Sequence, residues 1–197
     1  GDAVLADLHD SEVLHDGRPA EPEAAAWYRE GLRALRDGRL ETARALMQRS
    51  LEREPQAIAT MAAFSEVLAR AGAVAEARNW AQAAERAAAS LPRPEQLRIA
   101  AHRAALEFRW ADAEAHLQAL FQLNPGDAES GFRLAETQLS AARLDAAEAT
   151  LARLKTLNSP ARDGFRLDLL RARIAVARGD HAGRLVAAES ARMQAGN

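Results

Sequence analysis

The chain has 197 residues, of which 48% are hydrophobic and 5% aromatic, and its 26 basic and 28 acidic side chains give a formal charge of −2. A hydrophobic fraction of this size argues against disorder, and basic residues spread along the whole chain argue against nucleic-acid binding by this fragment. The absence of cysteine excludes disulfides and thiol catalysis, and no apolar run reaches the roughly 18 residues of a membrane span.

Residues 1–23 are the most acidic part of the chain and do not share the pattern that follows. Five acidic residues precede Gly17, and Asp16 followed by Gly17 is a turn signal. We predict that this segment is either a docked N-terminal cap or a loose linker. Because the chain begins with Gly1 rather than Met, we expect either a processed start or a segment of a longer protein.

Helical periodicity dominates the chain from residue 24 to residue 195. Apolar residues return at intervals of three and four, and no sustained strand-like alternation competes with them. Glycines, for which a left-handed backbone costs little, separate periodic segments at Gly38, Gly72 and Gly179. Prolines, which cannot continue a helix, mark the far ends of second helices at Pro55, Pro92, Pro94, Pro125 and Pro160. The pattern predicts pairs of helices of about a dozen residues each.

A small side chain recurs near the start of each second helix. The spacings are 34, 36 and 34 residues between Ala43, Ala77, Ala113 and Ala147. Each alanine lies five residues after a turn residue, and these are Gly38, Gly72, Phe108 and Ala142. The same helical face carries the residues four positions further on, which are Met47, Ala81, Leu117 and Leu151. We predict that the four alanines are buried where two helix backbones approach closely.

A helix–turn–helix unit with a period of 34 residues resembles the tetratricopeptide repeat. In the first unit the resemblance rests on Trp27, Gly31, Gly38, Ala43 and Pro55, with departures from the family pattern at Glu30, Ala34 and Met47. The third unit keeps Ala113 and the closing sequence LFQLNPGD. The resemblance implies an all-α fold, a right-handed superhelical array of antiparallel helix-turn-helix hairpins. After the N-terminal segment 1–23 we place units near 24–57, 58–93, 94–127 and 128–161, and a degenerate fifth unit at 162–197, where Arg184 stands in place of alanine.

The resemblance also implies that the first helix of each hairpin lines a concave groove. Periodicity along the predicted first helices suggests that the groove is lined by Tyr28, Leu32, Leu35, Glu66, Arg70, Arg98, His102, Phe132 and Glu136. A groove that is apolar at its first end and mixed in charge further along suits an amphipathic helix or an extended peptide. The alternative is that Tyr28, Leu32 and Phe132 pack against the N-terminal segment or a neighbouring hairpin. Some family members hold a C-terminal carboxylate with Lys and Asn, but Tyr28, Leu32 and Glu66 stand at those places here, so we do not expect that clamp.

No arrangement of residues predicts catalysis or a bound cofactor. His102 and His116 do not form an H-E-x-x-H motif, and the sequence has neither a G-x-S-x-G elbow nor a glycine-rich phosphate loop. The His-Asp pairs at 9–10 and 15–16 lack a third ligand at a fixed spacing. We therefore predict that the protein is not an enzyme and has no catalytic residue, metal or cofactor. An enzyme whose pocket gathers His102, His116 and carboxylates is the remaining alternative.

The sequence thus predicts a scaffold that binds a peptide or helix of a partner protein in its groove. Stretches such as WYREGLRALRDGRLETARALMQRSLEREPQ also resemble the repeat portions of bacterial signalling proteins, including transcriptional regulators and Ser/Thr kinases, which implies a regulatory part of a larger protein. An alternative is self-association as a homodimer through an uncapped terminal hairpin, where a stripe is formed by Leu185, Ala188 and Ala191. We expect neither nucleic acid nor membrane as a partner, and, without a visible signal peptide, a cytoplasmic location.

Overall fold

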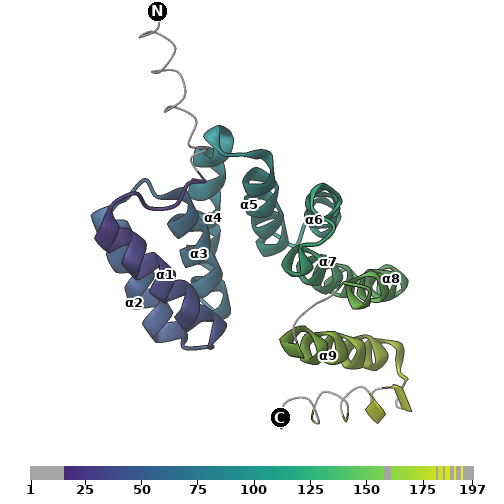
Figure 1. Cartoon of the computed structure of the whole chain (residues 1–197). Coiled ribbons are helices and arrows are strands. Elements are labelled where there is room, and N and C mark those ends of the chain that lie inside the picture. Colours follow the sequence, from purple (N-terminus) through teal and green to yellow (C-terminus); the bar gives the residue numbers. More distant parts are fainter. Residues whose placement is uncertain are drawn as a thin grey trace, which may run out of the picture. The chain divides into compact units, whose positions relative to one another are not determined.

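The computed structural model describes residues 16–157 and 161–180, and six further residues at 182, 183, 185, 186, 189 and 192. Within this part of the chain all regular elements are helical, as predicted, and the fold is an all-α repeat array (Figure 1). The elements are α1 (Pro22–Arg36), α2 (Leu40–Arg53), α3 (Ile58–Arg70), α4 (Val74–Ala87), the 3-10 turn η1 (Ala88–Ser90), α5 (Arg93–Leu106), α6 (Trp110–Leu123), α7 (Ala128–Ser140), α8 (Leu144–Lys155) and α9 (Ala161–Arg178). The predictions that concern His9, His15, Pro160, Arg184, Ala188 and Ala191 lie outside the described residues.

The helices pack as two compact units, of which the first ends at Glu107 and the second begins at Phe108. In the first unit α1 packs against α2, α2 against α3, α3 against α4, and α4 against α5. In the second unit the same serial packing joins α6, α7, α8 and α9. Each helix therefore buries its apolar face mainly against its neighbours in sequence, which is how stacked repeats build a core.

A left-handed residue follows the first helix at every predicted turn position. The backbone angle φ is +73° at Gly38, +85° at Gly72 and +74° at Gly179. Phe108 and Ala142 take the same conformation, with φ of 59° and 58°. A side chain in this conformation costs about 1–2 kcal/mol, whereas glycine adopts it freely. The turn positions that the spacing predicts are confirmed.

The recurring alanines lie in the core, as the spacing predicts. All four are 0% exposed, namely Ala43, Ala77, Ala113 and Ala147. The residues four positions further on are at most 4% exposed, namely Met47, Ala81, Leu117 and Leu151. Because protein interiors are packed about as densely as organic crystals, the helices leave no room there for a larger side chain.

Two of the prolines predicted to end second helices begin a first helix instead. Pro55 and Pro125 follow the ends of α2 and α6, as expected. In contrast, Pro92 is the N-cap of α5 and Pro94 lies in its first turn. Proline is tolerated at that place because the N–H groups of the first turn have no partner within the helix in any case. The second helix before them, α4, ends in η1 without a proline.

Of the predicted N-terminal segment 1–23, residues 16–21, which we call the cap, contact the first unit, and residues 22 and 23 already belong to α1. The Gly17 carbonyl accepts a hydrogen bond of 2.8 Å from the Ala59 amide. Gly17 is buried with φ of +73°, and a Cβ on it would lie 3.0 Å from Leu91 Cδ2, so a glycine is needed both for its backbone and for its close approach. The amides of residues 20 and 21 donate to the Glu54 carboxylate at 3.2 and 2.9 Å. Residues 18 and 19 line a hollow together with residues of α1.

Candidate protein-binding surface

The first helices α1, α3 and α5 lie together in the first unit. Helix α3 packs against both α1 and α5. Between α3 and α5, Ser65 Oγ lies 2.9 Å from His102 Nε2 and 2.7 Å from the Ala77 carbonyl. The single hydroxyl hydrogen of Ser65 is donated to that carbonyl, so His102 Nε2 is the donor in the other bond. The histidine that the sequence left as a candidate ligand therefore ties two helices together.

Tyr28 on α1 connects the surface to the docked cap. Burial raises the pKa of its hydroxyl, an effect that Arg18 opposes and Asp16 reinforces. Among the smaller effects on this hydroxyl, the charge of Glu95 on α5 raises its pKa and that of Arg98 lowers it. At neutral pH the hydroxyl keeps its proton and is able to donate a hydrogen bond to a ligand.

Six of the predicted groove residues form what we call the first-helix surface. All are partly or fully exposed on α1, α3 and α5, and they are Tyr28, Leu32, Glu66, Arg70, Arg98 and His102. Arg70 Nη2 lies 2.7 Å from Glu66 Oε1, and Arg98 pairs with Glu95 in the same way along its own helix. The surface is thus apolar and aromatic on α1 and charged on α3 and α5.

The other three predicted groove residues do not belong to this surface. Leu35 is only 6% exposed because it lies in the core cluster of the first unit, so its predicted exposure is wrong. Phe132, at 1% exposed, is buried in the second unit, where the Arg166 guanidinium covers its ring at 4.1 Å from the centroid. The packing alternative holds for this residue. Glu136 is partly exposed on α7, also in the second unit.

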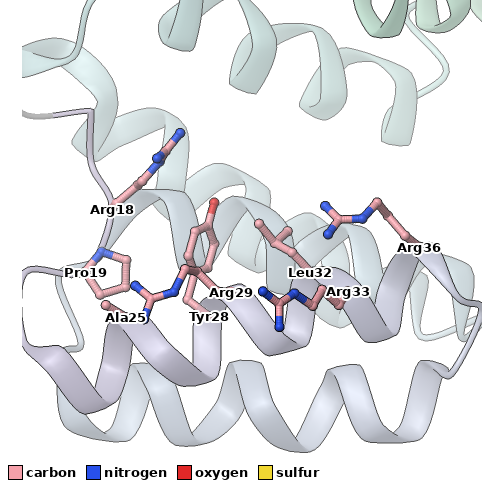
Figure 2. A pocket seen from close by; sticks show the side chains of 8 residues that line it. All are labelled: Arg18, Pro19, Ala25, Tyr28, Arg29, Leu32, Arg33 and Arg36. Atoms are coloured by element: carbon pink, nitrogen blue, oxygen red, sulfur yellow. The ribbon is translucent and has the colours of Figure 1, made fainter. Parts of the chain in front are cut away.

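A basic hollow of about 320 Å³ lies on α1 beside the cap (Figure 2). We call it the arginine hollow, and it is lined by Arg18, Pro19, Ala25, Tyr28, Arg29, Leu32, Arg33 and Arg36. Figure 2 shows Tyr28 and Leu32 next to each other along the helix, with Arg18 at one end and Arg36 at the other. Sequence reasoning found the two apolar residues but missed the arginines. The signal that marks them is the spacing of four and three residues between Arg29, Arg33 and Arg36.

The second unit contains a buried polar network that the sequence did not reveal. Glu114 on α6 is 2% exposed, and its carboxylate accepts hydrogen bonds from Arg143 Nη1 at 2.6 Å and from Gln138 Nε2 at 3.0 Å. Thr150 Oγ1 on α8 donates to Gln138 Oε1 at 2.8 Å. Within the described residues each buried polar group of the network has a partner, and the network joins α6, α7 and α8.

Among the described residues there is no cluster of three or more His, Asp or Glu side chains that is able to hold a metal ion. His102 lies in the first unit and His116 in the second, and within the described part of the chain neither belongs to such a cluster. No described helix combines the length and the apolar character that are required to cross a bilayer.

Comparisons with known proteins agree with the geometry of the hairpins. Residues 104–174 match a family model described as tetratricopeptide repeat. Over these residues the resemblance to the tetratricopeptide repeat that the sequence predicts is confirmed. Comparison with curated protein sequences gave no match.

Solved structures share the fold, among them two that are described as tetratricopeptide repeat proteins. A thermophilic member from Thermus thermophilus has a TM-score of 0.71 at 19% identity, over 88% of this chain and 92% of that one. MamA of Desulfovibrio magneticus RS-1, from its residue 41 onward, has a TM-score of 0.52 at 16% identity, over 89% and 95%. A tetratricopeptide protein from Parabacteroides merdae has a TM-score of 0.51 at 15% identity, over 90% and 68%. At these identities the likeness concerns the fold alone.

Proposed function

We propose that this tetratricopeptide protein is an interaction scaffold that binds a peptide or helix of a partner protein on the first-helix surface. Stacked helical hairpins present an extended face built from successive first helices, and a partner segment is able to contact several of them at once. The fold supports a role in protein–protein interaction. The choice of surface rests on the chemistry of α1, α3 and α5.

The proposal depends on one observation: the adjacent first helices expose apolar side chains on α1 and charged side chains on α3 and α5. Tyr28 and Leu32 offer apolar anchors that remain partly open to solvent. The pairs formed by Glu66 with Arg70, and by Arg98 with Glu95, lie on the neighbouring helices and supply polar contacts. Apolar anchors with a polar surround are the arrangement by which grooves bind peptides. Because the His102 and Ser65 bond fixes α5 against α3, little of the surface has to be ordered on binding.

Selection of peptides from a random display library against the full chain tests this function. We expect selected peptides to bind wild type and to lose affinity by about tenfold or more when Arg98→Ala removes one charged contact. The matched control is Arg86→Ala, an exposed arginine on the second helix α4, which should leave the affinity unchanged. Equal binding to both variants, or failure to select any peptide, would refute the proposed surface.

The resemblance to the repeat portions of bacterial signalling proteins supports a more specific proposal. There, occupancy of the surface by a cytoplasmic partner would change the activity of an attached output domain. If Arg98→Ala abolishes peptide binding but leaves the output of such a longer protein unchanged, this regulatory role is excluded.

A second candidate function is self-association through α9. Phe165, Leu169 and Val176 are 36%, 46% and 57% exposed, and their spacing places them near one face of the helix. Leu185 is exposed as well. Light scattering over a range of concentrations should then show a dimer that Leu169→Arg converts to a monomer. A wild-type chain that stays monomeric throughout the range excludes this candidate.

A further inference from the structure

We propose that the arginine hollow binds an acidic, extended segment of a partner protein, with the carboxylates of the segment on the arginines and its alternate side chains on Tyr28 and Leu32. The inference rests on the proposed function and adds the chemical class of the partner. It follows from the charge of the hollow, the spacing of its arginines and the uncharged residues that complete its lining.

Three of the four arginines of the hollow have no acidic partner within the described residues. Within the described residues, Arg29, Arg33 and Arg36 form neither an ion pair nor a side-chain hydrogen bond, and no acidic residue lines the hollow. The fourth arginine, Arg18, lies 2.9 Å from the Asp16 carboxylate. The whole chain carries a charge of −2, so this cluster does not reflect a generally basic surface. A concave site lined by one sign of charge attracts ligands of the opposite sign.

The spacing of the arginines matches an extended chain. At a rise of about 1.5 Å per residue, Arg29 and Arg33 lie about 6 Å apart along α1, and Arg36 follows about 4.5 Å further on. In an extended peptide, side chains on one side repeat every two residues, which is about 6.6 Å. Carboxylates at alternate positions therefore reach successive guanidinium groups, each of which is able to bind a carboxylate through two parallel hydrogen bonds.

The uncharged part of the hollow predicts that the residues between the carboxylates of the bound segment are apolar. Pro19, Ala25, Tyr28 and Leu32 form its uncharged part, and Tyr28 and Leu32 follow each other along α1 beside the arginines (Figure 2). An extended peptide that runs along α1 points alternate side chains to opposite sides. One set then meets the arginines, and the other set meets the phenol ring and the leucine.

The hollow fits the carboxylates of an acidic peptide better than the phosphates of a nucleic acid. The hollow is confined to α1 and the cap, whereas binding to a phosphate backbone requires a basic strip that continues over a larger area. The uncharged residues that line the hollow also have no role in contacts to phosphate. The hollow differs from the Lys and Asn clamp of some tetratricopeptide proteins, because its charges come from arginines of α1 and the cap and not from successive first helices.

Fluorescence anisotropy with two synthetic probes tests the proposal on the full chain. The first probe is a fluorescein-labelled peptide of six Glu-Leu repeats, and the second contains six Lys-Leu repeats. We expect the acidic probe to bind at least about tenfold more tightly than the basic one, and to weaken as NaCl rises from about 50 to about 300 mM. Arg29→Glu/Arg33→Glu should abolish this preference.

The matched control is Arg49→Glu/Arg86→Glu, which changes the net charge by the same amount. Both control arginines are exposed, lie outside the hollow and form no ion pair within the described residues. If both double variants weaken the acidic probe equally, the effect is one of net charge and the proposal is wrong. Circular dichroism of the two double variants checks that both remain helical.

Three further outcomes would overturn the inference. Equal affinity for the two probes would show that the hollow does not select carboxylates, and tighter binding of a labelled oligothymidylate would assign it to nucleic acid. The third outcome concerns the acidic residues of the chain itself, Asp2, Asp7, Asp10 and Glu12. If wild type binds no probe but binds the acidic one once these four are changed to Asn or Gln, the chain's own N-terminal segment is the occupant and not a partner.

Failure of this inference is distinguishable from failure of the proposed function. Peptides from the display selection that bind wild type, lose affinity in Arg98→Ala and ignore Arg29→Glu/Arg33→Glu leave the scaffold function intact and refute only the acidic partner. Absence of any selected peptide, in contrast, refutes the scaffold surface itself.

Discussion

Replacing Ala142 with glycine is expected to stabilise the second unit, whereas the same change one residue earlier should destabilise it. Ala142 is exposed and has a left-handed backbone, with φ of 58°. Its neighbour Ala141 is the C-cap of α7 and has φ of −81°, which any residue adopts. The two alanines therefore differ in backbone strain, although they are adjacent and carry the same side chain.

The magnitude follows from two opposing terms. A left-handed conformation costs alanine about 1–2 kcal/mol, and glycine removes that cost. Glycine also makes the unfolded chain more flexible, which destabilises the fold by about 0.4–1 kcal/mol. At Ala142 both terms act, and the net gain lies between about 0 and about 1.6 kcal/mol. At Ala141 only the second term acts, and the loss is about 0.4–1 kcal/mol.

Thermal unfolding followed by circular dichroism measures the difference. In a chain of this size, 1 kcal/mol shifts Tm by roughly 2–4 °C, so the two variants should differ by about 2–8 °C with wild type between them. Urea unfolding gives an independent measure of the same order. If Ala142→Gly and Ala141→Gly lower Tm by the same amount, the turn is not strained at Ala142 and the argument from φ fails.

Three other changes test the core and the charges. Ala43→Leu should destabilise by about 1–3 kcal/mol in urea unfolding because the buried helix contact has no room, and equal tolerance of Arg44→Leu and Ala43→Leu would contradict the assigned face. Glu114→Ala should cost about 2–3 kcal/mol because it leaves a buried amide without an acceptor, and an unchanged urea midpoint would show that the network contributes nothing. Burial opposes ionisation of Glu129, but the hydrogen bond and charge of Arg166 lower its pKa below 4.5. The stability that the carboxylate contributes is therefore present above pH 4.5 and is lost as the pH falls through the lowered pKa, where the unfolding free energies of wild type and Glu129→Gln should converge. A difference that grows on acidification would reverse this sign.

The repeat itself could be predicted from sequence because it depends on features that one residue type imposes locally. Glycine at Gly38 and Gly72 marks a left-handed turn, and a small residue five positions later marks a close helix contact. These two signals are independent, and their agreement located even the turns at Phe108 and Ala142, where no glycine is present. Pro92 and Pro94 were misplaced because proline is equally compatible with the residue after a helix and with the first turn of the next.

The sequence predicted the candidate site less completely, because the exposure of a side chain depends on whether another helix covers the helix face on which it lies. Helical periodicity placed Tyr28 and Leu35 on one stripe, but the core of the first unit buries Leu35 and leaves Tyr28 partly open. The network of Glu114, Gln138 and Thr150 spans three helices and has no local pattern at all. Such contacts arise only when the hairpins are packed.

The arginine hollow lies on α1, which among the described helices packs closely against fewer neighbours than α3 does. Helix α3 packs against α1, α2, α4 and α5, so other helices cover it on opposite sides. Helix α1 packs chiefly against α2 and, more lightly, against α3. A helix face that no other helix covers is not restricted to small or apolar residues, because overpacking and burial of charge do not arise there. Within the described residues, Arg29 and Arg33 are exposed on such a face, whereas Gly31, which lies against Met47 of α2, follows the repeat. The residues that distinguish this scaffold from others of the same fold are therefore expected on α1 more than on the helices that are packed on both sides.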